Sequence, residues 1–297
     1  MDLTEGSVPQ AENLQPSAVI LGTAQDGGYP QAGCRAPCCR NLEASSAGPL
    51  HPSCLAICDP ATNSRWMIDC TPAFPLQLAL LDSICPGNNP DFLLTHAHIG
   101  HYTGLTHLGN EVMGARDVEV VVLPLMKDFL ENNLPWSELL DNGNIVLRPA
   151  AAGEAIGLGK DLSVTPILVP HRDEHSETAC YRVDGPECSI LWLPDIDGWG
   201  EMTPPIEELI AEADRAFLDG SFFSPGELPG RDMGSIAHPL IQESIELFSG
   251  LDEDARRKIS FIHLNHSNPA IDPRSDAARA VALAGHSIAR QGDQIEL

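Results

Sequence analysis

The sequence is poor in basic residues. Its 297 residues include 17 Lys and Arg against 42 Asp and Glu, which gives a formal net charge of −25 at pH 7. Because proteins bind nucleic acid through Lys and Arg that neutralise phosphates, this balance argues against a nucleic-acid partner. It also disfavours adhesion to an anionic membrane surface. The surplus of acidic side chains is typical of a surface that keeps a protein in solution.

The sequence also lacks the hydrophobic segments that target or anchor a chain. No window approaches the roughly 18 uninterrupted apolar residues of a membrane span. Residues 1–17 have neither the basic nor the apolar stretch of a secretory signal. We therefore expect a disordered leader at 1–17, a cytoplasmic location and no membrane partner.

No repeat, low-complexity segment or composition shift divides the chain, and strand and helix patterns alternate along it. Apolar runs such as 164–169 predict strands, whereas Pro75 opens a predicted helix that should carry Leu76 and Leu81 inward. Hydrophobic and charged contents of 43% and 20% are those of an ordinary globular protein. Residues 18–297 therefore predict one layered α/β domain.

The strongest chemical signal is a histidine cluster made of His96, His98 and His101. It follows the apolar run 92–94, which predicts a buried strand, and α/β folds usually build sites in the loop beyond a strand's carboxyl end. Imidazoles one residue apart on an extended loop can point to a common centre, and neutral imidazole binds Zn, Fe, Ni or Cu. The pattern predicts a metal site; the alternative is three ordinary solvated or core histidines.

This run resembles the H-x-H-x-D-H signature of the metallo-β-lactamase superfamily. The resemblance implies an α/β fold of four layers, an αββα sandwich, with a site for one or two metals between two β-sheets. Gly100 stands where the family usually has an aspartate. Since that aspartate normally ligates the second metal, the resemblance leaves the second site open.

The resemblance also implies further ligands at the ends of later strands, in chain order. His171 directly follows an apolar strand, and His175 is the alternative to it. Asp195 stands where the superfamily has a metal-bridging aspartate, and Asp197 is a possible substitute for the missing carboxylate. His263 matches the last histidine ligand.

These candidates divide into two sets. The first metal would be held by His96, His98 and His171, and a second, weaker one by His101, His263 and Asp195. Asp69 follows the predicted strand 65–68, where the fold has an aspartate that accepts the free N–H of a metal-bound histidine. The alternative for Asp69 is an Asx turn.

Two residues are candidates for catalysis. The chain resembles the phosphonate-pathway cyclic phosphodiesterases of the superfamily, in which a histidine at the position of His238 contacts substrate phosphate or protonates the leaving group. Asp195 would orient the nucleophile. The alternative for His238 is capping of the helix that follows it. Asp26, Gln25 and Arg172 are further candidates for the lining of the cleft.

A cysteine cluster forms a second constellation. Nine cysteines are an odd number, and clustered thiols in a reducing compartment favour metal binding over crosslinking. Cys34, Cys38 and Cys39 can supply most of a structural zinc site, and His266 offers a fourth ligand. The cyclic phosphodiesterases pair such a cluster with a late histidine, although the adjacent Cys38 and Cys39 depart from their C-x-C-x-x-C spacing. The alternative is a set of free buried thiols.

End to end, the chain is similar to the pyrroloquinoline quinone biosynthesis protein B family, a branch of the same superfamily. The similarity is carried by the segments 21–34, 213–223 and 261–269. The chain keeps His96 and His98, whereas members of that family have a degenerate first motif.

Three functional hypotheses follow. The leading one is a metal-dependent hydrolase in which metal-activated water attacks an ester or phosphodiester. The second is an oxygen-dependent non-haem iron step in pyrroloquinoline quinone biosynthesis. The third is a non-catalytic metal-binding or carrier protein. Zinc is the expected metal, one ion structural and one or two in the active site, with Fe²⁺ or Mn²⁺ as alternatives there. The expected partner is a small-molecule substrate, and a homodimer is possible.

Overall fold

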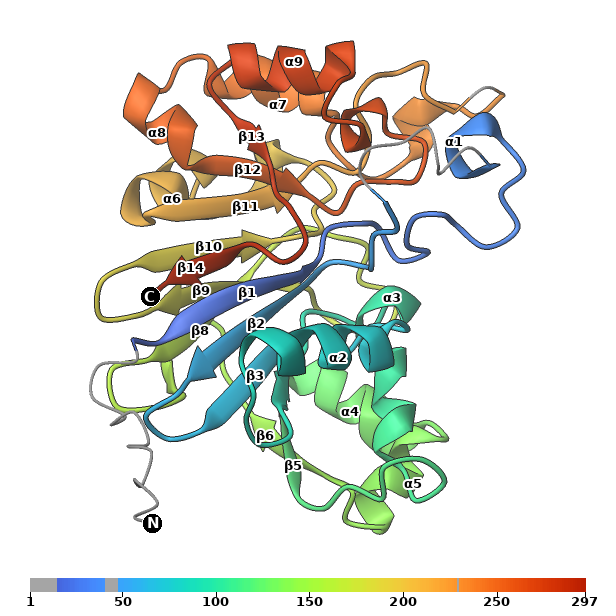
Figure 1. Cartoon of the computed structure of the whole chain (residues 1–297), viewed down its shortest axis with the longest axis vertical. Coiled ribbons are helices and arrows are strands. Elements are labelled where there is room, and N and C mark those ends of the chain that lie inside the picture. The colour runs from blue at the N-terminus through green and yellow to red at the C-terminus, as the bar shows by residue number, and fades with distance from the viewer. Residues whose placement is uncertain (1–14, 41–47, 229) are drawn as a thin grey trace, which may run out of the picture.

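The computed structural model describes residues 15–40, 48–228 and 230–297, and two stacked β-sheets lie at its centre (Figure 1). The strands of the first sheet lie in the order β14 (Gln294–Glu296), β1 (Ser17–Gly22), β2 (Cys54–Asp59), β3 (Ser64–Ile68), β4 (Asp91–Leu93), β5 (Val118–Val122) and β6 (Ile145–Pro149). The strands of the second sheet lie in the order β13 (Ser287–Ile288), β12 (Ile259–Ile262), β11 (Arg215–Asp219), β10 (Ser189–Leu193), β9 (Ala179–Asp184), β8 (Ser163–Leu168) and β7 (Ile156–Gly157).

Helices cover the outer faces of both sheets (Figure 1). The first sheet packs against α2 (Phe74–Ile84), α4 (Pro124–Asn132) and α5 (Trp136–Asp141). The second packs against α6 (Ile206–Glu212), α7 (Ile241–Phe248), α8 (Glu253–Lys258) and α9 (Asp276–Leu283). Two short helices, α1 (Pro37–Arg40) and α3 (Ile99–Tyr102), lie among the loops at one end of the sheets.

Each sheet is buried on both faces, which explains the nearly continuous apolar runs in its strands. In β1, Val19 and Leu21 pack toward the helices that cover the first sheet, whereas Ala18 and Ile20 pack toward the second sheet. The layer between the sheets is built around large side chains such as Trp192. The predicted α/β class and the four-layer αββα sandwich are therefore confirmed.

Two details differ from the sequence-based expectations. Ser17, which was placed in the leader, is already the first residue of β1, and residues 1–14 lie outside the described part of the chain. Leu76 was expected to face inward but is 60% exposed, because α2 buries its other face through Phe74, Gln77 and Leu81. None of the helices in the described ranges is long and apolar enough to cross a membrane.

The order of the strands brings many carboxyl ends to one edge of the sandwich. In the first sheet β3, β4, β5 and β6 run parallel to one another, and in the second β10, β11, β12 and β13 do so. The carboxyl ends of parallel strands meet at the same edge of a sheet, which is where α/β proteins place their sites. Loops from both sheets therefore gather at this edge.

The segment that follows β1 is hydrogen-bonded to both sheets at this edge. The amides of Thr23 and Ala24 donate to the carbonyl of His51, just before β2, at 3.0 and 2.9 Å. The amide of Gln25 donates to the carbonyl of Leu264, just after β12, at 2.9 Å. One stretch of backbone thus joins the two sheets beside the loops that carry the candidate ligands.

Truncation of the Phe92 side chain tests the packing that supports those loops. Phe92 is fully buried in β4, and its ring lies 5.7 Å from that of Phe74, centroid to centroid. We expect Phe92→Ala to lower the free energy of unfolding by about 3–5 kcal/mol, because it leaves a cavity under α2. Urea denaturation measures this change. The exposed Leu76→Ala should change stability by less than about 0.5 kcal/mol, and equal effects would contradict the assigned packing.

Candidate metal centre

The strand ends bring the predicted histidines and aspartates together. His96 and His98 follow β4, and His101 lies in α3. From the second sheet come the residues after β8, β10 and β12, namely His171, Asp195 and His263. Their side chains form overlapping groups in which the possible ligand atoms lie within 4.8 Å of one another. The centre therefore lies between the two sheets, with ligands from both.

The first group consists of His96, His98 and His171. His171 Nε2 lies 3.2 Å from His98 Nδ1. The other nitrogen of each ring has a polar neighbour. His96 Nδ1 lies 3.0 Å from the Thr95 hydroxyl, His171 Nδ1 lies 2.8 Å from Asp197 Oδ1, and His98 Nε2 lies 3.4 Å from Glu174 Oε2. His96 Nε2, by contrast, is buried without a hydrogen-bond partner. A buried nitrogen that faces two further imidazoles and lacks a partner is suited to a metal ion.

The second group contains His101, His263 and Asp195. Asp195 Oδ2 lies 3.0 Å from His101 Nε2 and 3.3 Å from His263 Nε2. The opposite nitrogens are tied to the protein, because His101 Nδ1 lies 2.7 Å from Asp69 Oδ2 and His263 Nδ1 lies 2.9 Å from the Ser221 hydroxyl. Both rings therefore turn Nε2 toward the same carboxylate, an arrangement typical of metal-binding histidines.

The Asp195 carboxylate lies between the two groups. Its Oδ1 atom lies 3.7 Å from His171 Nε2, whereas Oδ2 faces His101 and His263. Burial alone would raise the pKa of Asp195, but His263 and His101 hold it well below its usual value. Asp195 is thus an anionic group with one oxygen toward each histidine group, as a bridging ligand requires.

The protonation states of the first group favour metal binding. Burial lowers the pKa of His96 well below its ordinary value, and it also lowers the pKa of His98 and His171. These rings are therefore neutral at pH 7, which is the form of imidazole that binds metals. The residues of the first group are suited to hold one metal ion. The residues of the second group supply ligands for a second ion beside it.

The backbone is strained at two of these positions. Asp69 and His263 have φ angles of 70° and 59°, in the left-handed region that residues other than glycine rarely adopt. Such conformations cost about 1–3 kcal/mol each and cluster at functional sites. Asp69 is held in place because its carboxylate accepts hydrogen bonds from the amide and hydroxyl of Thr95. The strained backbone at Asp69 lowers the stability of the fold, and the placement of the Asp69 carboxylate orients His101.

Two residues that the sequence offered as ligands, His175 and Asp197, are not members of the two ligand groups. His175 is exposed and its ring lies 6.0 Å from that of Phe129, so the structure brings His171 rather than His175 to the centre. Asp197 contacts His171 Nδ1, on the side of the ring opposite His98. Asp197 therefore lies where it can orient His171, and it does not take the place of a carboxylate at position 100.

His238 lies beside the second group and is held by an aspartate that the sequence analysis missed. His238 Nδ1 lies 2.7 Å from Asp219 Oδ2, and both side chains are buried. Burial lowers the pKa of His238, but the adjacent Asp219 raises it by more, to about 9. Asp219 ends β11, next to the strand that leads to Asp195. Its position at the carboxyl end of a parallel strand was the signal that could have revealed it.

A cleft of about 880 Å³ opens from His238 toward the cysteine cluster. Its polar lining includes Gln25, Arg172, Arg231, Asn265 and His266. Gln25 and Arg172, proposed from the sequence, therefore do line a cleft, and Arg231 was not anticipated.

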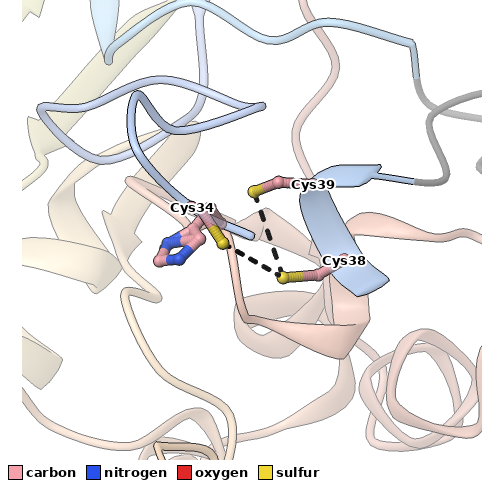
Figure 2. A group of neighbouring side chains, drawn as sticks. Cys34, Cys38 and Cys39 are labelled. Carbon is pink, nitrogen blue, oxygen red and sulfur yellow. Dashed lines mark hydrogen bonds between the residues drawn. The ribbon is translucent and has the colours of Figure 1, made fainter. Parts of the chain in front are cut away.

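The cysteine cluster lies at the far end of this cleft. Cys34, Cys38, Cys39 and His266 have their possible ligand atoms within 4.8 Å of one another. Figure 2 shows the three sulfur atoms turned toward one another, and Cys38 Sγ lies 4.0 Å from each of the other two. That spacing is close to the edge of about 3.8 Å in a tetrahedral site with Zn–S bonds of about 2.3 Å. His266 Nδ1 is buried and has no hydrogen-bond partner, as expected for the fourth ligand.

The fold and the arrangement of the candidate ligands are those of an αββα protein with a metal site between its two β-sheets. A family model described as "Beta-lactamase superfamily domain" matches residues 65–264, well over half of the chain. The chain therefore belongs to the β-lactamase superfamily, as predicted from its histidine motif.

The chain is also similar to one group of named proteins and to several solved structures. It is 25% identical to Coenzyme PQQ synthesis protein B of Xanthomonas campestris pv. campestris (strain B100) over 308 residues, which cover 94% of this chain and 99% of that protein. Its fold resembles the crystal structure of Zn²⁺-bound PqqB from Methylobacterium extorquens, with a TM-score of 0.80, 20% identity and coverage of 95% and 100% of the two chains. A diphosphatase of the PhnP family matches with a TM-score of 0.69, 20% identity and coverage of 96% and 98%.

Replacement of Asp69 tests its role in holding His101. Asp69→Asn keeps the shape of the side chain but weakens the acceptor for His101 Nδ1. We expect the metal affinity of the centre to fall about 10- to 100-fold, because residues behind metal ligands contribute this much. Isothermal titration calorimetry with Zn²⁺ measures the change. Asp59→Asn replaces a buried aspartate outside the ligand groups and serves as control; equal losses in both variants would contradict the assigned role.

Removal of one thiol tests the cysteine site. We expect Cys38→Ser to lose about one equivalent of zinc and to melt at a lower temperature, because structural zinc contributes to folding free energy. Elemental analysis and thermal melting measure both effects. Cys188→Ser changes a cysteine outside the cluster and should retain the metal. A wild-type metal content in Cys38→Ser would rule out this ligand.

Proposed function

We propose that this protein is a metal-dependent hydrolase that acts on an anionic ester, and that this ester is a phosphodiester. The observation that carries the proposal is the pair of histidine groups that share Asp195, next to His238, which lines a cleft with two arginines. Membership of the β-lactamase superfamily supports such a reaction.

The ligand groups suit zinc or a similar divalent ion. His96, His98 and His171 offer neutral nitrogens, and Asp195 offers a carboxylate that faces both groups. Zinc held by imidazoles lowers the pKa of bound water toward neutrality and so supplies a nucleophile at physiological pH. Asp195 can orient that water by accepting a hydrogen bond from it, because its carboxylate is ionised. Fe²⁺ and Mn²⁺ also accept such ligands.

His238 is suited to act as the acid. Its Nδ1 atom is paired with Asp219, which leaves Nε2 for the cleft that His238 lines. With a pKa of about 9 the ring is protonated at neutral pH. It can therefore stabilise an anionic oxygen of the substrate or protonate the departing alkoxide. The Asp219 carboxylate stabilises the positive charge of the ring before the transfer.

The charges of the cleft support an anionic substrate. Arg172 and Arg231 line it together with one acidic residue, Asp232, in a protein whose net charge is −25. Arginine presents a planar set of donors that fits phosphate, so the two arginines of the cleft that His238 lines form a suitable subsite. The structural similarity to a diphosphatase points in the same direction.

Zinc-loaded protein should hydrolyse bis-para-nitrophenyl phosphate, and the released nitrophenolate is followed by absorbance. For a dialkyl phosphodiester, whose alkoxide leaving group needs a proton, His238→Asn should lower kcat about 100- to 10,000-fold, because a positioned general acid contributes this much. Phosphorus NMR follows the product of this second substrate. Metal content should not change in the variant. His175→Asn alters an exposed histidine outside the ligand groups and should keep wild-type activity.

Metal-dependent turnover of the dialkyl phosphodiester that survives His238→Asn would exclude His238 as the acid. Absence of hydrolysis of any phosphate or carboxylate ester by protein shown to hold its metal would exclude the hydrolase. Arg172→Ala should mainly raise KM, because Arg172 is placed to bind the substrate and not to react with it.

A second candidate function comes from the similarity to Coenzyme PQQ synthesis protein B, which extends over 94% of this chain. The function would be an oxygen-dependent step at non-haem iron, since histidines with a carboxylate also suit Fe²⁺. Oxygen uptake by Fe²⁺-loaded protein with a tyrosine-derived quinone precursor would favour it over hydrolysis. Tight metal binding without either activity would favour a carrier.

A further inference from the structure

Position 100 is a glycine because a neighbouring side chain leaves no room for a larger residue. It is buried in α3, between His98 and His101, and its backbone is not in the left-handed region, so a side chain would be allowed there by conformation alone. A Cβ atom at this position would overlap the Asp26 carboxylate and lie 2.6 Å from Asp26 Cβ. The side chain of Asp26 therefore occupies the volume into which a side chain at position 100 would extend.

The Asp26 carboxylate lies against the second histidine group. Asp26 Oδ1 is 3.3 Å from His101 Nε2 and 3.3 Å from His263 Nε2. These are the same nitrogens that face Asp195 Oδ2. Each of the two rings has its Nδ1 atom already paired with Asp69 or Ser221. The carboxylates of Asp26 and Asp195, which come from different parts of the chain, thus face the same two Nε2 atoms.

The distances match metal coordination better than ion pairing. Charge-assisted hydrogen bonds between histidine and carboxylate are short, and in this protein the pairs His101–Asp69 and His238–Asp219 both measure 2.7 Å. The two distances from Asp26 are 3.3 Å. Ligands at about 2.0–2.1 Å from a tetrahedral zinc ion are separated by about 3.3–3.4 Å. The contacts of Asp26 therefore have the spacing of two ligands on one ion.

Hydrogen bonds of the loop hold Asp26 in this place. The amide of Gln25 donates to the carbonyl of Leu264 at 2.9 Å, and the amide of Gly28 donates to the carbonyl of Gln25 at 2.7 Å. Gly28 has a φ of 66° and ends this turn, in which Asp26 is the second residue. Since Leu264 follows His263 directly, Asp26 and one of its partners are held by the same backbone contact.

We propose that Asp26 is a ligand of the second metal ion, together with His101, His263 and Asp195. The first loop of the chain thereby supplies the carboxylate that Gly100 does not. Two neutral imidazoles and two carboxylates would balance the charge of a divalent cation. The inference rests on the proposed metal centre but does not depend on the reaction that the centre catalyses.

The test compares the wild type with Asp26→Gly and with the exchange variant Asp26→Gly/Gly100→Asp. We expect Asp26→Gly to lose about one equivalent of zinc and to bind the second ion at least about 100-fold more weakly, because a direct ligand is worth more than the residues behind it. The exchange variant should regain the lost equivalent. Elemental analysis, calorimetry and anomalous scattering at the zinc edge measure occupancy without any assay of activity.

Three further variants serve as controls. Asp173→Gly makes the same replacement in an exposed loop and should keep all metal. Gly100→Asp alone should melt at a lower temperature, because the new side chain collides with Asp26. Asp26→Asn keeps the volume of the side chain, so that loss of the second ion can be followed even if Asp26→Gly does not fold.

The outcomes separate this inference from the proposed function. Unchanged occupancy and affinity in both Asp26→Gly and Asp26→Asn would overturn the assignment of Asp26. Wild-type protein that binds only one ion in the histidine groups would also overturn it, while leaving a one-metal hydrolase intact. Failure of the wild type to bind any ion there would remove the metal centre itself. Loss in Asp26→Gly with recovery in the exchange variant supports the proposal.

Discussion

The structure depends on the burial of ionisable side chains at the junction of two apolar layers. Asp69, Asp195 and Asp219 are almost completely inaccessible, and unpaired charges in such a place would cost several kcal/mol each. Each is accommodated because an imidazole lies beside it: His101 next to Asp69 and Asp195, and His238 next to Asp219. The centre is therefore a network in which the removal of one member leaves another without a partner, and this couples the chemistry of the site to the packing of the sheets.

Much of this network could be predicted from the sequence. The apolar runs fixed the strand positions, because both faces of each sheet are buried, and a strand end followed by His or Asp marks the edge where the ligands meet. His96 was found in this way, and the resemblance to the metallo-β-lactamase superfamily added His171 and His263. Gly100 was the one position where the motif departs from its family pattern, and the sequence showed that departure clearly.

Other features could not be read from the sequence because they arise from distant contacts. Asp26 was expected only to line the cleft, and its place beside His101 arises from the fold. Asp219 was passed over because a single aspartate at a strand end is usually a capping or turn residue. Leu76 faces solvent although its helix is apolar on several sides, since α2 has only one sheet to cover. In each case the sequence pattern reflects only neighbours along the chain, whereas the contact that determines where the side chain lies is made with a distant part of the sequence.

The hydrogen bonds from the segment after β1 to both sheets have a consequence for motion. Main-chain hydrogen bonds join the two sheets at the edge where the ligands lie: Ala24 and Gln25 bond to the loops before β2 and after β12, and the amide of Ala179 donates to the carbonyl of Thr95 at 3.0 Å. Sliding of one sheet over the other would break these bonds, so they restrict relative displacement of the two sets of ligands. Access to the centre then depends on the loops around the cleft and not on any separation of the sheets.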